Sequence, residues 1–191
     1  MGTQSLTADE NLPRVCPDDA PPAKCRLLRY QLNVIAADVA DVVQSIGGWL
    51  FDRSMAGWDV NVLLASHNDT RPLRILGVRT FELHPTLLSI GSAAERAAGL
   101  AIAADLLGTD ECIDAEIHDA LQSGEVEVTL WGENPFAERA TVVQYRLSAA
   151  ARIFKGCALA AAALTDVPVA PVETLLCSGY RPVDSHLRPV S

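Results

Sequence analysis

Two tryptophans stand close to an oppositely charged pair near the start of the apolar part of the chain. If this segment is helical, Trp49 and Arg53 share a face because four residues separate them, and the guanidinium can stack on the indole. Asp52 then lies on the adjoining side. Aromatic rings beside a charged pair are typical of ligand pockets and of binding hot spots. We name Trp49, Asp52, Arg53 and Trp58 as candidate ligand- or partner-binding residues; the structural alternative is two core tryptophans with an ion pair that fixes the helix end.

A second, weaker candidate follows the strand that is predicted to end at Trp131. Glu133 comes shortly after this strand, where a carboxylate can serve as a general base. Trp131 and Glu133 therefore join the candidate binding residues. No residue is predicted to be catalytic, because the four histidines fall in separate segments and their spacing does not unite them with a nucleophile and an acid.

Metal and cofactor motifs are absent from the sequence. The five cysteines contain no C-x-x-C pair, and no histidine stands at metal-ligand spacing, so neither a zinc site nor a redox motif is predicted. A phosphate-binding loop needs its glycines between a strand and a helix. Gly47 and Gly48 instead lie within or at the end of a predicted helix, and Gly77 lies within a predicted strand. We predict no metal and no cofactor.

The charge balance narrows the classes of partner. The chain of 191 residues carries a formal net charge of -9, which on average repels nucleic acid and anionic membrane surfaces. Nucleic acid is therefore disfavoured as a partner. The longest apolar run, from Cys157 to Leu164, is too short to span a membrane, and the first residues lack the pattern of a secretory signal. We predict a soluble, cytoplasmic protein with no membrane association.

Proline content and apolar patterning divide the chain into three parts. Residues 1–24 form a Pro-rich acidic leader, which is predicted to be disordered because it buries too little apolar surface to offset its ordering entropy. Residues 25–166 form a single α+β domain. Residues 167–191 form a Pro-rich extended segment, with an edge strand expected at 172–177 although prolines, which break strands, lie on each side of it.

An apolar stripe at helical spacing predicts the first of two long helices. The stripe covers residues 28–46, and Asp38 and Asp41 fall off it, so these two carboxylates face water or a neighbouring element. The helix either ends at the paired glycines that follow or continues to Ala56, with Gly57 as its stop.

The remaining elements follow from the same kind of pattern. Further helices are predicted at 93–107, 111–122 and 136–164, and strands at 59–64, 73–83 and 125–131. The first two strands are joined by a loop too short for a helical crossover, so we expect an antiparallel hairpin. The third strand alternates, which predicts valines facing inward and two glutamates facing water.

These elements predict an α+β fold, in which a small mixed or antiparallel sheet of about three to four strands packs against about four helices, two of them long. The apolar stripes, the Pro-rich ends and the lack of catalytic motifs indicate a non-enzymatic interaction or regulatory protein. It is expected to act through helix-mediated self-association as a homodimer or through binding of a protein partner. The alternative is a small-molecule-binding domain or enzyme with a Trp-lined pocket near Trp49 and Trp58.

Overall fold

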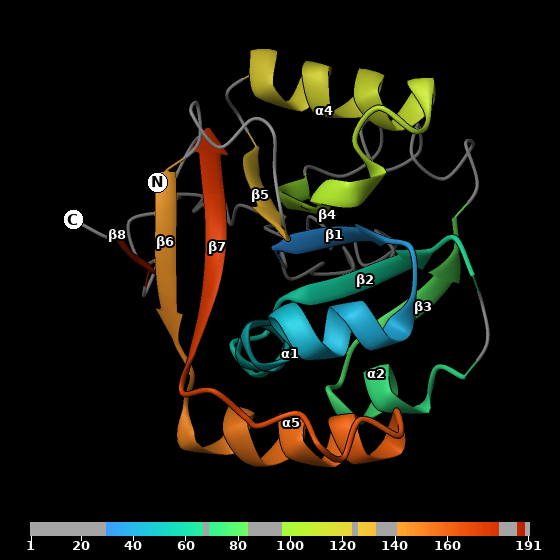
Figure 1. Ribbon diagram of the computed structural model, residues 1–191. Helices are drawn as coiled ribbons and strands as arrows, with labels where there is room; N and C mark the ends of the chain where they lie inside the picture. Colours follow the sequence, from blue (N-terminus) through green and yellow to red (C-terminus); the bar gives the residue numbers. More distant parts are fainter. Residues whose placement is uncertain are drawn as a thin grey trace, which may run out of the picture.

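The computed structural model describes residues 30–66, 69–83, 97–123, 126–132, 141–179 and 187–189. Within these ranges the chain forms one eight-stranded sheet, in the order β3-β2-β1-β4-β5-β7-β6-β8 (Figure 1). The strands are β1 (Gln31–Ala36), β2 (Asp59–Leu64), β3 (Arg79–Glu82), β4 (Ala97–Ala103), β5 (Glu127–Trp131), β6 (Thr141–Arg146), β7 (Val172–Gly179) and β8 (Leu187–Pro189). The helices are α1 (Val39–Met55), α2 (Arg71–Ile75), α4 (Glu111–Ser123) and α5 (Ala149–Ala161), with a short 3-10 helix η1 (Ala104–Leu106).

The first five strands make the parallel half of the sheet. β1 lies in its middle and pairs with β2 on one side and β4 on the other, while β3 and β5 follow outward. Parallel neighbours need crossover connections, and α1 and α2 lie in these connections on one face of the sheet. After β4 the chain passes through η1 to α4, which covers the opposite face (Figure 1).

The last three strands extend the sheet through antiparallel pairs. β7 pairs with β5, β6 pairs with β7, and β8 pairs with β6. α5 connects β6 to β7 and packs against α1 and α2 (Figure 1). α5 therefore lies on the same face of the sheet as α1 and α2. No helix within the described ranges is long and apolar enough to cross a bilayer.

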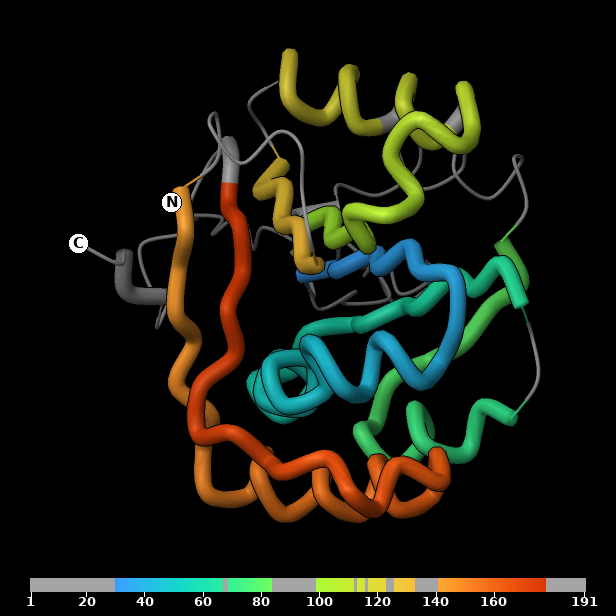
Figure 2. The backbone as a smooth tube through the Cα atoms, viewed as in Figure 1, coloured from blue at the N-terminus to red at the C-terminus, as the bar shows by residue number. Residues whose placement is uncertain are grey.

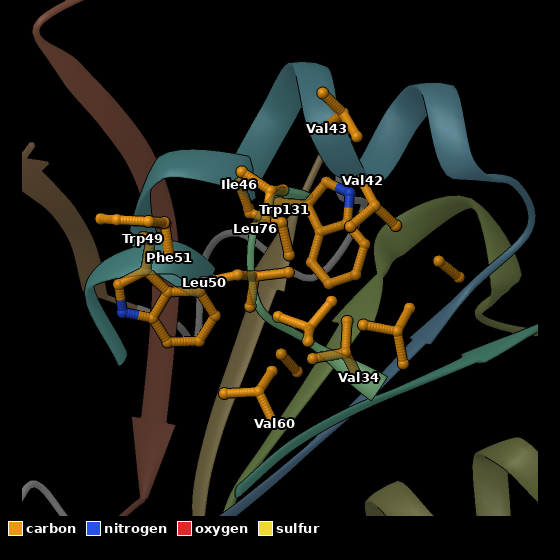
Figure 3. Close-up of a cluster of buried hydrophobic side chains, with 14 of the residues drawn as sticks. Val34, Val42, Val43, Ile46, Trp49, Leu50, Phe51, Val60, Leu76 and Trp131 are labelled. Atoms are coloured by element: carbon orange, nitrogen blue, oxygen red, sulfur yellow. The ribbon is translucent and has the colours of Figure 1, made fainter. Parts of the chain in front are cut away.

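Both faces of the central strands are buried. In β1, Leu32, Val34 and Ala36 belong to the core on the α1 side, whereas Ile35 belongs to the core on the α4 side. The larger core lies between the sheet and α1, α2 and α5. Figure 3 shows part of this core beside α1. A strand that is buried on both faces shows a continuous apolar run instead of an alternating pattern.

The character of β1 corrects the prediction of a helix over residues 28–46. Within that range Gln31–Ala36 form β1, and the helix begins only at Val39. A short apolar strand buried on both faces can match helical spacing by chance, and periodicity does not separate the two cases. α1 continues through the paired glycines to Met55, which confirms the longer of the two predicted helix ends, and Gly57 follows with φ of 89°.

The predicted antiparallel hairpin is wrong as well. β2 and β3 pair in parallel, because α2 provides a short crossover that begins before the strand predicted over 73–83 and takes up its first residues. Pro72 lies in the first turn of α2, where its missing N–H costs nothing. Gly77 then adopts φ of 74°, a left-handed conformation that separates α2 from β3.

Two further ranges that were predicted to be helices contain strands. The Ala-rich range 93–107 contains β4, although alanine by itself favours helix. β4 packs closely against the Leu32 side chain of β1 at Gly99, since a Cβ on Gly99 would lie 3.0 Å from Leu32 Cδ1. The predicted helix over 136–164 contains β6, and only its later part is α5, which begins where Ser148 Oγ accepts a hydrogen bond from the N–H of Ala151 at 2.9 Å.

The other elements were predicted in part. α4 confirms the helix over 111–122. β5 confirms a strand within 125–131, but Glu127 is 3% exposed and does not face water. β7 is not an edge strand, because β5 and β6 flank it. The predicted small α+β sheet is therefore wrong: the chain has a large mixed sheet with helices on both faces. The predicted leader over residues 1–24 lies outside the described residues.

Candidate functional site

β1 and β4 are neighbouring strands from which the chain leaves toward opposite faces of the sheet. Ile35 of β1 lies beside Ile102 of β4, so both strands end at the same level. Beyond β1 the chain enters α1 on one face, and beyond β4 it enters η1 and α4 on the other (Figure 1). This reversal is the topological switch point, and open α/β sheets bind their ligands beside it, at the carboxyl ends of the strands. We therefore take this edge as the candidate site.

Two carboxylates occupy the first turn of α1 at this edge. Asp38 is the N-cap, and its Oδ1 accepts a hydrogen bond from the backbone N–H of Asp41 at 2.9 Å. Asp41 Oδ1 accepts from Ser45 Oγ at 2.8 Å, and Asp41 Oδ2 accepts from Trp131 Nε1 at 2.7 Å. Asp41 is half-buried, whereas Asp38 is exposed. Asp41 is thus held in place, while Asp38 presents its carboxylate to solvent.

The electrostatics of this edge favour a positively charged or hydrogen-bond-donating ligand. The first turn of a helix carries the positive end of the helix dipole, which stabilises ionised carboxylates there. Asp105, exposed in η1 just beyond β4, adds another carboxylate to the edge. These groups repel an anion, whereas an ammonium or a hydroxyl group finds acceptors. Within the described ranges, no three His, Cys, Asp or Glu side chains converge to hold a metal ion.

The predicted cluster of tryptophans and arginine lies toward the other end of α1. The Cζ atom of Arg53 lies 5.5 Å from the ring centroid of Trp49 and 4.4 Å from that of Trp58. Tyr30 stacks on Trp58 with 5.1 Å between ring centroids. The guanidinium therefore contacts both indoles, including the one predicted four residues earlier. Trp49 is only 2% exposed, so its ring offers little surface to a ligand.

Asp52 connects α1 to the antiparallel half of the sheet. Its Oδ2 accepts hydrogen bonds from the Tyr145 hydroxyl at 3.2 Å and from the backbone N–H of Ser148 at 3.0 Å. Burial, and next the charge of Asp52, raise the pKa of Tyr145 above its ordinary value. Asp52 thus joins the end of β6 and the start of α5 to the second half of α1.

Trp131 lies apart from Trp49. Figure 3 shows the two indoles apart in the buried cluster, with Ile46 and Leu50 of α1 between them. The hydrogen bond to Asp41 makes Trp131 part of the switch-point edge, so the structure separates it from the Arg53 cluster. Glu133, the other residue of the second candidate, lies outside the described residues.

Comparison with known proteins shows which fold this is. No known protein family and no curated protein matches the sequence. A teicoplanin deacetylase in complex with teicoplanin is similar in structure, with a TM-score of 0.54 and 14% identity over 80% of this chain and 100% of its own. The zinc-inhibited form of a teicoplanin deacetylase has a TM-score of 0.54 at 14% identity, over 81% of this chain and 100% of its own. The pseudoaglycone deacetylase of the antimicrobial reagent A40926 has a TM-score of 0.52 at 14% identity, over 81% of this chain and 99% of its own.

These likenesses establish a shared fold, and they correct the functional prediction. The fold is one found in deacetylases, which are enzymes, so the prediction of a non-enzymatic interaction or regulatory protein is wrong. Part of its physical basis also fails, because Val42 and Ile46 of the predicted stripe over residues 28–46 are buried inside this chain and are not free for a partner helix. The alternative prediction, a small-molecule-binding domain or enzyme, agrees better with these findings.

Sequence reasoning did not identify the switch-point carboxylates as a site. Reading residues 28–46 as one helix leaves Asp38 and Asp41 as ordinary polar residues of that helix. The signal that was available is a short apolar run followed by an N-cap aspartate, which is typical of a strand that passes into a helix.

Proposed function

We propose that this chain binds a small polar molecule that carries an amine or several hydroxyl groups, at the edge formed by the carboxyl ends of β1 and β4. The observation that carries the proposal is the first turn of α1, where Asp38 and Asp41 place two carboxylates beside the switch point. Ligands of open α/β sheets bind at this position because the loops there diverge to opposite faces.

The chemistry of the edge supports amino sugars as the ligand class. Carboxylate oxygens accept hydrogen bonds from sugar hydroxyls and pair with an ammonium group, and an amino sugar offers both. Asp41 is already oriented by Ser45 and Trp131, so little side-chain entropy is lost when a ligand binds to it. Asp38, which is exposed, is the residue that we assign to the ligand amine.

Amide hydrolysis is a second candidate function, and the likeness to deacetylases favours it. In this reaction water adds to the acyl carbon, the carbon–nitrogen bond breaks, and the amine leaves with a proton while a carboxylic acid is released. We assign Asp38 as the group that takes the proton from water and returns it to the amine, because its carboxylate is exposed at the edge.

Glucosamine and N-acetylglucosamine serve as the test ligands, with inorganic phosphate as the anionic control. Isothermal titration calorimetry should detect binding of glucosamine and no binding of phosphate. Replacing Asp38→Asn keeps a good N-cap but removes the charge, and should weaken glucosamine binding about five- to tenfold. The matched control is Asp59→Asn, which removes the carboxylate that pairs with Arg79 at the opposite edge of the sheet and should leave the affinity unchanged.

Each outcome bears on one of the two candidate functions. If the unaltered protein releases acetate from N-acetylglucosamine and the Asp38→Asn protein does not, hydrolysis is supported. If the unaltered protein binds the ligand and releases no acetate, binding alone is supported. If glucosamine does not bind, or if both variants bind it as the unaltered protein does, the switch-point proposal is wrong.

A further inference from the structure

α1 bends at its middle. Figure 2 shows the first half of the helix lying across the view and the second half almost end-on. Gly47 and Gly48 occupy the middle of its sequence, and paired small residues are a common cause of a bend. A Cβ on Gly48 would lie 2.5 Å from Leu147 Cδ1 and 3.1 Å from Glu173 Oε1. The side chains of Leu147 and Glu173 therefore pack directly against the backbone of α1 at Gly48.

An ion pair is inserted at the same place. Glu173 of β7 accepts hydrogen bonds from the backbone N–H of Gly48 at 2.9 Å and of Trp49 at 2.8 Å. Lys155 of α5 donates to Glu173 Oε1 at 2.5 Å and to the carbonyl of Gln44 at 2.7 Å. Gln44 and Gly48 carry the carbonyl and the N–H that a straight α-helix joins to each other. The ion pair thus bridges one turn of α1.

The two charges match the dipoles of the two halves of the helix. The Lys155 ammonium lies on a carbonyl at the end of the first half, and the Glu173 carboxylate lies on the N–H groups that begin the second half. Both side chains are almost fully buried, and this burial raises the pKa of Glu173 above its ordinary value. Apolar residues of similar volume often stabilise a protein as well as a buried ion pair does, so stability alone does not explain these charges.

Other contacts hold the two ends of the bent helix. Asp52 ties the second half to Tyr145 and Ser148. Because the second half is anchored, the angle at the bend determines where the first half of α1 begins. The hydrogen bond between Asp41 and Trp131 reports this placement directly, since it joins the first turn to β5.

We propose that Lys155 and Glu173 are positioning residues, whose ion pair holds the bend of α1 and thereby places Asp38 and Asp41 at the switch point. The expected effect of the ion pair on ligand binding rests on the proposed function. Its expected effect on the hydrogen bond between Asp41 and Trp131 does not.

The test replaces both charges together, as Lys155→Met with Glu173→Met, because an apolar pair keeps the core filled. Residual dipolar couplings along α1 give the angle between its halves, and the indole N–H resonance of Trp131 reports its bond to Asp41. Glucosamine affinity is measured on the same protein. The matched control is Val62→Ala at a fully buried residue of β2 in the same core, which lowers stability and leaves every hydrogen-bonding group of the ion pair in place.

We expect the double variant to fold, to change the angle of α1, to shift the Trp131 resonance and to bind glucosamine at least about tenfold more weakly. The Val62→Ala control should change neither the angle nor the resonance. An unchanged angle and resonance in the double variant would overturn the inference. Should the double variant not fold, the isosteric Glu173→Gln protein is judged by the same two readouts. If angle and resonance change but the unaltered protein binds no glucosamine, the positioning role stands and the proposed function fails.

Discussion

The indole Nε1 of Trp131 donates a hydrogen bond to Asp41 Oδ2 at 2.7 Å, although 90 residues separate them in the chain. The bond joins the carboxyl end of β5, the strand beside β4, to the first turn of α1, the helix that begins at the switch point. Trp131 is 2% exposed, which means that its N–H has little access to water if the carboxylate moves away. This bond therefore favours one position of the first turn.

Replacing Trp131→Phe should destabilise the protein more than the same change at Trp49. Both indoles are 2% exposed, so the lost volume is matched. Trp131 Nε1 bonds a carboxylate, whereas Trp49 Nε1 is buried with no hydrogen-bond partner among the described residues. A hydrogen bond to a charged group is worth about 1.5–3 kcal/mol, so the free energy of unfolding should differ by at least about 1 kcal/mol between the variants. Urea denaturation measures this difference, and equal losses would contradict the role given to the bond.

Gly48→Ala and Gly156→Ala should change stability in opposite directions, although both residues lie within helices. A Cβ at Gly48 would come 2.5 Å from Leu147 Cδ1, so we expect a loss of about 1–3 kcal/mol. A Cβ at Gly156 would meet Val169 Cγ2 at an ordinary 3.6 Å. There the helix preference of alanine should add about 0.5–1 kcal/mol. Thermal and urea unfolding decide the signs, and a stabilised Gly48→Ala protein would show that the bend tolerates a side chain.

Removing Lys155 alone should cost far more than removing the whole ion pair. In the Lys155→Met protein the Glu173 carboxylate remains buried with its two backbone donors but without its cation, which should cost about 3–5 kcal/mol. The double variant with Glu173→Met should recover most of this loss. A double-mutant cycle from urea denaturation gives the coupling energy of the pair, and a coupling near zero would mean that the two charges act independently.

Glu173 should make stability depend on pH in a defined direction. Burial raises the pKa of Glu173 in the folded protein. Its contribution is therefore fully present below the unfolded pKa of about 4.3 and is lost as pH rises through the folded pKa. The stability of the unaltered protein relative to Glu173→Gln should fall as pH rises through this window, as urea denaturation at successive pH values would measure.

Asp69 provides a control of opposite sign for this pH dependence. A side-chain hydrogen bond from Arg71 lowers the pKa of Asp69, so its contribution is present above the unfolded pKa and is lost as pH falls through the folded pKa. Relative to Asp69→Asn, the unaltered protein should therefore lose stability on acidification. If stability changed with pH in the same direction in the two comparisons, burial would not be the dominant influence on the pKa of Glu173.

The sequence by itself determined the features that depend on neighbours along the chain. α4 appeared where a helical stripe predicted it, α1 ran on to Met55, and Arg53 reached Trp49 from four residues away. These features follow from helical spacing and caps, which act over one or two turns.

Only the tertiary structure decided the architecture and the site. β1 and β4 became strands because they lie side by side in the middle of the sheet with both faces covered, and such strands show no alternation that a sequence pattern can detect. The bond from Trp131 to Asp41 and the bond from Gly48 to Glu173 join residues 90 and 125 positions apart. Contacts of this kind exist only after the sheet has formed, so the local sequence pattern does not predict them. The physical reason is that burial and pairing between distant segments outweigh the small free-energy preferences of each segment alone.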